Sequence, residues 1–185
     1  MTVPLVVTFV GGPHGSWHVE RLEAVVGEGL APVARVAMVE APATLPSGGV
    51  WQLRGVTSNE RYTERDERDV LVARQQGLGR PEATRAALIP IKKTEAWWAL
   101  AQDERRAIFE ARSRHIARGL EVLPAVARRL HHGRDLGEAF DFLTWFEYAP
   151  TAASAFEDLV ATLRSTEEWA YVEREIDIRL ARSSN

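Results

Sequence analysis

Short apolar segments with the two-residue period of a β-strand recur along this chain and alternate with segments of helical period. The first, VPLVVTFV at residues 3–10, is rich in β-branched residues and ends at a Gly-Gly-Pro turn signal. Successive side chains of a strand face opposite sides of a sheet, so runs of this kind indicate half-buried or buried strands. The order in which these segments follow one another limits the possible folds more than any single motif does.

We expect helices where apolar residues recur at helical spacing after a capping signal such as Ser16, Thr94 or Pro150. These helices are expected at 17–28, 64–76, 95–118 and 151–164. The other strands are expected at 32–40, 51–58, 86–93, after Pro124, at 140–148 and in the closing VEREIDIRLA. One strand is thus followed twice by helix-strand-strand-helix-strand. This order predicts an α+β fold in which two ferredoxin-like halves, 1–93 and 94–185, form one compact unit.

Composition limits the functions that the chain can have. Its 185 residues are 45% hydrophobic and 26% charged, with a formal net charge of -3, as in ordinary soluble domains. The sequence has no block of basic residues of the kind that would suggest binding to nucleic acid. The absence of cysteine excludes disulfides, thiolate metal sites and the attachment of c-type haem. No segment resembles a signal peptide or a membrane span, so we expect a cytoplasmic protein without a membrane partner.

His115 is the first candidate for a functional role. It falls near the end of the expected helix 95–118, where the helix dipole stabilises a partly exposed histidine. The alternative is a ligand to a metal or a haem iron, since neutral imidazole is a common iron ligand. Pro124 separates this helix from the next strand, so His115 and the arginines that follow belong to different elements.

Arg128 is the second candidate. It shares one face of the strand after Pro124 with Val126 and Leu130, while Arg129 and His131 share the other. If the first face is buried, the Arg128 guanidinium needs a negative or strongly accepting partner. If the strand lies at an edge, the side chain can reach water instead.

An aromatic strand and a pair of tryptophans complete the unusual features. FDFLTWFEY at 140–148 places one hydroxyl, Thr144, within an otherwise aromatic face, which suits either a core or the wall of a flat ligand. In KKTEAWW at 92–98 two lysines precede Trp97, and they are either solvated or paired with carboxylates. An unbroken helix would hold Trp97 and His115 about 27 Å apart, whereas a break near Asp103 would let them share a site.

Glu167 and Glu168 precede the last strand. Such a pair is usually exposed, but a carboxylate can also hold the second nitrogen of a ligand histidine.

Several blocks, in this order along the chain, together resemble the chlorite dismutase family, and most closely its short lineage. They are WQLRGVTSNERYTER, ARQQGLGRPEATRAALIPIKKTEAWW, DERRAIFEARSRHIA, LPAVARRLHHGRDLGEAFDFLTWFEYAP and LRSTEEWAYVEREIDIRLAR. The resemblance covers residues 51–182, and the first 50 residues agree in length and element order. It implies a dimeric α+β barrel, a homodimer, and the conversion of chlorite to chloride and dioxygen on haem b.

The resemblance also implies roles for individual residues. His115 matches the axial ligand of the iron, and Glu168 matches the carboxylate that holds it, with Glu167 as the neighbour in competition. Arg128 matches the arginine on the substrate side, and Gln75 the glutamine that restrains it. The remaining matches lie around the haem: Lys93, Trp97, Ile89, Tyr62, Thr144 and Phe146.

Other readings of the same sequence remain open. A coproheme decarboxylase-like enzyme belongs to the same superfamily, but Arg128 and the short length argue against it. A non-catalytic haem-binding or sensing protein, or an α+β barrel without haem, would release no oxygen from chlorite.

Overall fold

The computed structural model describes residues 4–57 and 63–182, which form a closed antiparallel barrel with helices on one side. Around the barrel the strands follow the order β1-β3-β2-β8-β5-β7-β6-β4. The strands are β1 (Val6–Gly12), β2 (Trp17–Val26), β3 (Arg35–Glu40), β4 (Trp51–Thr57), β5 (Arg85–Lys93), β6 (Val126–His132), β7 (Phe142–Tyr148) and β8 (Val172–Ala181). The α-helices are α1 (Arg65–Arg74), α2 (Glu95–Ala99), α3 (Gln102–Arg106), α4 (His115–Glu121) and α5 (Ala153–Arg164). The predicted α+β class is confirmed.

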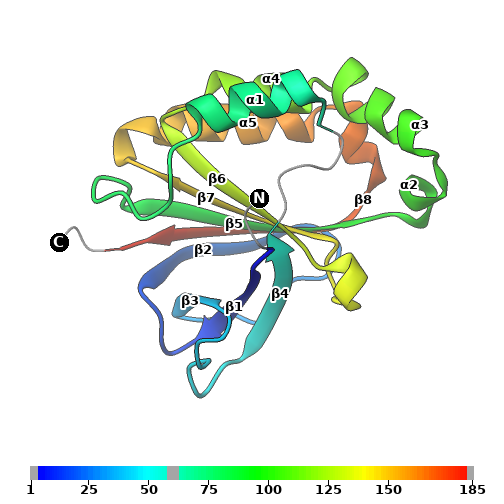
Figure 1. Cartoon of the computed structure of the whole chain (residues 1–185). Helices are drawn as coiled ribbons and strands as arrows, with labels where there is room; N and C mark the ends of the chain where they lie inside the picture. The colour runs from blue at the N-terminus through cyan, green and yellow to red at the C-terminus, as the bar shows by residue number, and fades with distance from the viewer. Residues whose placement is uncertain (1–3, 58–62, 183–185) are drawn as a thin grey trace.

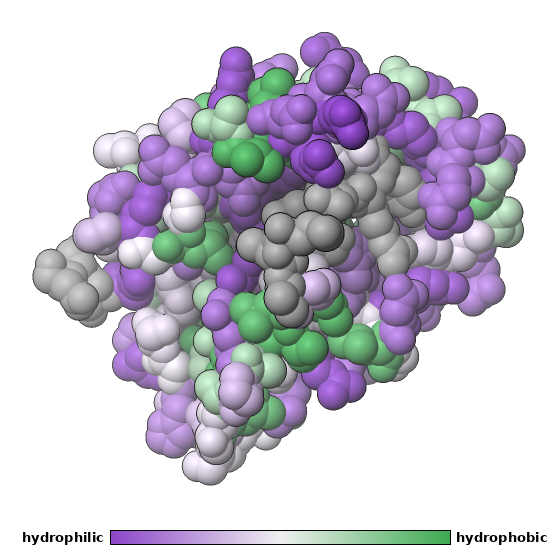
Figure 2. Space-filling model, in the orientation of Figure 1, coloured by the Kyte–Doolittle hydropathy of each residue, from purple (hydrophilic) through white to green (hydrophobic). Residues whose placement is uncertain are grey.

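Figure 1 shows the helices as a layer above β5, β6, β7 and β8, while β1 to β4 form the other side of the barrel. From β5 onward the chain runs strand, helices, strand, strand, helix, strand, and these strands lie side by side in the order β8-β5-β7-β6. That is the element order of a ferredoxin-like unit. The division into two such halves, 1–93 and 94–185, stays a prediction. Figure 2 shows hydrophilic side chains over most of the helical layer.

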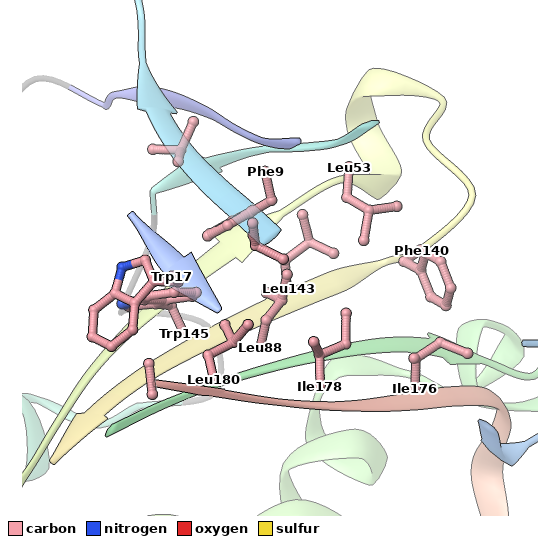
Figure 3. Close-up of a cluster of buried hydrophobic side chains, with 13 residues drawn as sticks. Phe9, Trp17, Leu53, Leu88, Phe140, Leu143, Trp145, Ile176, Ile178 and Leu180 are labelled. Atoms are coloured by element: carbon pink, nitrogen blue, oxygen red, sulfur yellow. The ribbon is translucent and has the colours of Figure 1, made fainter. Parts of the chain in front are cut away.

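The inside of the barrel is a hydrocarbon core. Each strand sends alternate side chains inward, and large residues from opposite strands meet there (Figure 3). Its fully buried members include Phe9, Leu88, Leu143, Trp145, Ile176, Ile178 and Leu180. Side chains on the other face of β5 to β8 point toward the helices, and these build a second cluster with α5. The strands therefore separate a structural core from a helix-covered face.

The helix predicted at 17–28 is wrong, because this segment forms strand β2. Two β-bulges interrupt its pairing with β8, between Val19 and Arg21 and between Ala24 and Val26. A bulge adds a residue and turns a period of two into a local spacing of three. Val19 and Leu22 thus face the core from a strand although their spacing imitates a helix.

The long helix predicted at 95–118 is divided into three helices and a π-helical turn, η1 (Ala107–Arg112). Thr94 caps α2 as expected, and its hydroxyl accepts a hydrogen bond from Trp97 N. The break comes at Leu100 and Ala101, earlier than the predicted Asp103, and Ala101 is the N-cap of α3. A break in this segment was expected to let Trp97 and His115 share a site, and both residues do line one cavity.

Smaller departures concern strand ends. β7 begins at Phe142, and Phe140 packs in the barrel core rather than on the aromatic face of the strand. The 3₁₀-helix η3 (Pro150–Ala152) precedes α5, and the 3₁₀-helices η2 (Arg134–Leu136) and η4 (Glu167–Tyr171) follow β6 and precede β8. Within the described ranges, none of the helices combines the length and apolar character needed to cross a bilayer.

Candidate active site

A cavity lies between the helical layer and the outer face of β5, β6 and β7. Eight of the ten residues singled out from the sequence line it: Lys93, Trp97, His115, Glu168, Arg128, Ile89, Thr144 and Phe146. Apolar side chains supply most of the remaining wall, among them Ile91, Val126, Phe142, Leu159, Val160 and Leu163. A largely apolar cavity with a few convergent polar groups is the usual form of a cofactor or ligand site.

On the helical side, His115 belongs to a chain of three titratable groups, and the other two, Glu168 and Lys93, are buried. Its Nδ1 lies 2.7 Å from Glu168 Oε2, and Lys93 Nζ donates to Glu168 Oε1 over 2.8 Å. Glu168 and Lys93 are almost completely buried, at 3% and 4% exposure. No other bond of the imidazole is found among the described residues, so Nε2 is left for a ligand in the cavity. The carboxylate fixes the orientation of the ring.

Glu168 stays ionised in this setting. Burial alone would raise the pKa of its carboxyl, but the charges of His115 and Lys93 and their hydrogen bonds lower it to about 2. Of the two glutamates before the last strand, Glu168 is therefore the partner of His115. Glu167 is exposed and pairs with Arg112 at 3.1 Å.

Local backbone structure places His115 at the start of a helix, not in the last turn that the sequence pattern indicated. Arg114 adopts the left-handed conformation, with φ 53°, and this breaks the helix directly before His115. A side chain other than glycine is uncommon there, and such strain often accompanies a functional site. The new helix α4 is capped from outside, since the Glu110 carboxylate accepts from Ile116 N at 2.6 Å and Ala117 N at 3.2 Å.

On the strand side, Arg128 points from β6 into the same cavity. Its register partner on β7 is Phe146, and Ile89 and Leu130 both pair with Thr144, so these side chains form one continuous wall. Burial lowers the pKa of the Arg128 guanidinium, which nevertheless remains charged. Among the residues that the structure describes, no carboxylate or carbonyl accepts from this guanidinium. A partly buried cation with free donors in an apolar cavity is ready to bind an anion.

Gln75 lies just after α1 and does not line this cavity. Its side chain donates from Nε2 to the backbone carbonyl of Arg128 over 2.6 Å, so it holds the strand rather than the guanidinium. It belongs to a second pocket that also touches Arg128. Tyr62, the tenth predicted site residue, lies outside the described residues.

The sequence reasoning missed several residues around His115. Phe109 and Trp169 lie nearly parallel to its ring, with centroids 4.3 Å and 6.4 Å away. Lys93 Nζ stands over the rings of Trp97 and Trp169 at 4.6 Å and 5.5 Å. Trp169 directly follows Glu168 in the sequence, and this adjacency was the one signal that could have placed Trp169 near His115.

These features define a class of protein: an α+β barrel whose helix-covered sheet carries a cavity lined by a carboxylate-backed imidazole and an arginine. The chain belongs to the chlorite dismutase family, because the family model described as "Chlorite dismutase" matches residues 46–184. The family predicted from the sequence blocks is thereby confirmed.

Individual relatives agree with this membership. The dimeric chlorite dismutase of Nitrobacter winogradskyi is 58% identical, covers 95% of this chain and 99% of its own, and superimposes with a TM-score of 0.88. A mutant chlorite dismutase of Candidatus Nitrospira defluvii, at 22% identity and TM-score 0.69 over 98% of this chain and 93% of its own, shares the fold. The chlorite dismutase of Ideonella dechloratans is 34% identical over 86 residues. That match spans 46% of this chain and only 28% of the relative.

Proposed function

We propose that this protein is a haem-dependent enzyme that converts chlorite to chloride and dioxygen. The observation that carries the proposal is the pairing, in one apolar cavity, of an imidazole backed by a carboxylate with an arginine that lacks a partner among the described residues. The relatives named as chlorite dismutases support the same reaction.

The cavity fits a haem. His115 Nε2 would hold the iron, and the apolar side chains of β5, β6, β7 and α5 would enclose the flat macrocycle. When bound, haem b supplies an iron centre that exchanges oxygen atoms and electrons with chlorite. Lys93 is already committed to Glu168 and is assigned to that carboxylate, not to a haem propionate.

The protein side chains would control charge and water. Glu168 accepts the Nδ1 proton of His115, holds the ring in one orientation and makes Nε2 a stronger donor of electron density. Arg128 offers a permanently charged, planar set of N–H donors, which suits a small chlorine oxyanion and keeps it from escaping. Phe146 and the aliphatic walls exclude water and so strengthen the field of the guanidinium.

Gln75 would limit the movement of Arg128 by fixing its strand, and Thr144, Ile89 and Tyr62 would shape the haem pocket. We also propose that the protein is a homodimer, because the relative from Nitrobacter winogradskyi is described as dimeric. Its proposed location is the cytoplasm, as the sequence analysis expects.

The test is to supply haem to the purified chain, record the absorption spectrum and add chlorite in an oxygen-electrode cell. We expect a Soret band, oxygen release, and one chloride for each oxygen molecule. Arg128→Ala should keep haem and lose activity about 100-fold or more, and His115→Ala should lose or loosen haem. Arg54→Ala, which removes an exposed arginine of β4, is the control.

Wild-type oxygen release by Arg128→Ala would contradict the role of that residue. Haem binding without oxygen release by the wild type would overturn the enzymatic proposal and indicate a haem-binding protein. A wild type that binds no haem would remove the cofactor from the proposal.

A further inference from the structure

The face of β8 that meets α5 is charged although it is buried. Glu175, Asp177 and Arg179 occupy successive positions on this face, with exposures of 0%, 1% and 7%. Ile176 and Ile178, between them, point into the barrel core. A helix that packs on a sheet normally covers apolar side chains, because buried charges are costly unless they are paired. These charges therefore call for partners.

Arg164, the last residue of α5, supplies the main partner. Its Nε and Nη2 donate to Glu175 Oε1 over 2.8 and 2.6 Å, and Nη2 also reaches Asp177 Oδ2 at 2.7 Å. Arg179 binds the other side of Asp177. Asp177 thus makes contacts with arginines only, whereas Glu175 has a second oxygen that is not used by Arg164.

The second carboxylate oxygen of Glu175, Oε2, contacts a residue of the candidate active site. Trp169 donates its indole N–H to Glu175 Oε2 over 2.7 Å. The Trp169 ring is nearly parallel to His115, with an angle of 18° between the planes, and Lys93 Nζ stands over it. Trp169 and Glu175 both line the cavity. Two buried carboxylates therefore act on the surroundings of His115, Glu168 directly and Glu175 through an indole ring.

We propose that Glu175 is a positioning residue: anchored by Arg164, it fixes Trp169 against His115 and so sets the orientation of the imidazole. In this assignment Glu175 acts on His115 through Trp169, and its carboxylate takes no part in the reaction itself. For the haem-bound state the inference rests on the proposed function, since it assumes that His115 holds the iron.

Glu175→Gln separates this role from simple packing. A glutamine has the same shape, but its amide offers one acceptor oxygen and a donating NH₂ group. It can accept either from Arg164 or from Trp169 with full geometry, not from both. Trp169→Phe keeps a ring near His115 and removes the N–H donor instead. The two variants break the same hydrogen bond from opposite ends.

Asp177→Asn is the matched control. Asp177 is as deeply buried as Glu175, lies two residues away on the same face and shares Arg164, but it has no contact with Trp169. General loss of stability in the charged cluster should appear in all three variants, whereas loss of ring positioning should appear only in the first two.

The first measurement uses the full chain without haem, labelled with ¹⁵N. The Trp169 indole N–H is assigned by its absence in Trp169→Phe. We expect Glu175→Gln to move this resonance and the ring resonances of His115, and Asp177→Asn to leave both in place. This part of the test does not depend on haem, so it stands even if the wild type binds none.

The second measurement uses the haem-loaded chain. We expect Glu175→Gln and Trp169→Phe to change the g-values of the ferric iron in the same direction and to speed haem dissociation about tenfold. The double variant should add little to either single one. Unchanged His115 resonances and g-values in Glu175→Gln, or equal changes in Asp177→Asn, would overturn the inference. Wild-type haem binding in the same experiment keeps that result distinct from failure of the proposed function.

Discussion

The two faces of β8 have similar burial and opposite chemistry. Ile176, Ile178 and Leu180 point into the barrel and meet other hydrocarbon side chains (Figure 3). Glu175, Asp177 and Arg179 point toward α5 and meet charged partners. An apolar position requires only the right volume, whereas a buried charge requires a particular partner at a particular distance. The charged face thus fixes the relative positions of its side chains more strictly than the apolar face does. The candidate active site lies on this charged face.

The same contrast holds on β5. Leu88 fills the barrel, while Ile89 and Lys93 face the cavity. Two polar side chains are exceptions on the inner face. His131 of β6 is fully buried beside Phe9, and Glu147 of β7, which is 2% exposed, accepts a hydrogen bond from the indole N–H of Trp145. Substitutions on each face in turn test whether the inner face contributes only to stability and the outer face also to the candidate site.

The largest effect is expected on the outer face, for Lys93→Met. The substitution removes the ammonium group that pairs with the buried Glu168 carboxylate, and removing one member of a buried pair costs about 3–5 kcal/mol. Urea unfolding of the haem-free chain measures this loss. Lys93→Arg, which keeps the charge, should lose less. A loss below about 1 kcal/mol for Lys93→Met would mean that the pair behaves as if solvated.

On the inner face, Ile178→Ala should destabilise the chain by about 2–5 kcal/mol, because it opens a cavity in a closely packed core. Ile178→Val should cost about 0.5–1.5 kcal/mol. Both should leave the haem spectrum unchanged, since the side chain points away from the cavity. A shifted spectrum in the alanine variant would show that the two faces are mechanically coupled.

The buried His131 on the inner face should make the stability of the folded protein depend on pH. Its Nδ1 donates to Leu143 O, and its Nε2 accepts from Arg129 Nε, so the ring is neutral. Burial first, and then the positive charge of Arg129, lower the pKa of His131 from 6.5 to about 4. Between these two values the unfolded chain binds the proton more readily than the folded chain, so stability present above pH 6.5 falls as the pH drops toward 4.

The loss through that window should reach about 3 kcal/mol. Urea unfolding of the wild type and of His131→Gln at several pH values measures it, because the variant lacks the titrating ring. If the stability difference between the two proteins does not change from pH 7 to 4, the buried imidazole is not responsible.

The sequence predicts much of this arrangement, where its signals are local. The alternation predicts that Arg128 shares a face of its strand with Leu130 and that Thr144 shares a face of the next strand with Phe146, and the structure bears out both pairs. The resemblance selected Glu168, although the pattern alone could not separate it from Glu167. Both residues precede the same strand, and only the tertiary position of His115 distinguishes them.

The missed features depend on backbone irregularities and on distant contacts. Bulges in β2 imitate helical spacing, and the left-handed Arg114 ends one helix where no glycine or proline marks a break. Glu110 caps a helix that begins several residues later, and Glu175 reaches Trp169 only after the chain has turned from η4 into β8. No local pattern encodes these partners.

The smallest effect on stability is expected for Lys92→Met, although Lys92 is the direct neighbour of Lys93, where the largest effect is expected. Lys92 and Lys93 look equivalent in the sequence, but adjacent strand residues face opposite sides. Lys92 reaches the surface and pairs with Glu173 at 2.8 Å, where both side chains are more than 40% exposed. Glu173 raises the pKa of Lys92, yet solvent screens such exposed pairs and their net contribution to stability is small. The urea midpoint and the haem spectrum of Lys92→Met should both match the wild type. If Lys92→Met lowered the midpoint as much as Lys93→Met, burial would not be what separates the two lysines, and the contrast between the buried charges under the helices and the solvated surface would fail.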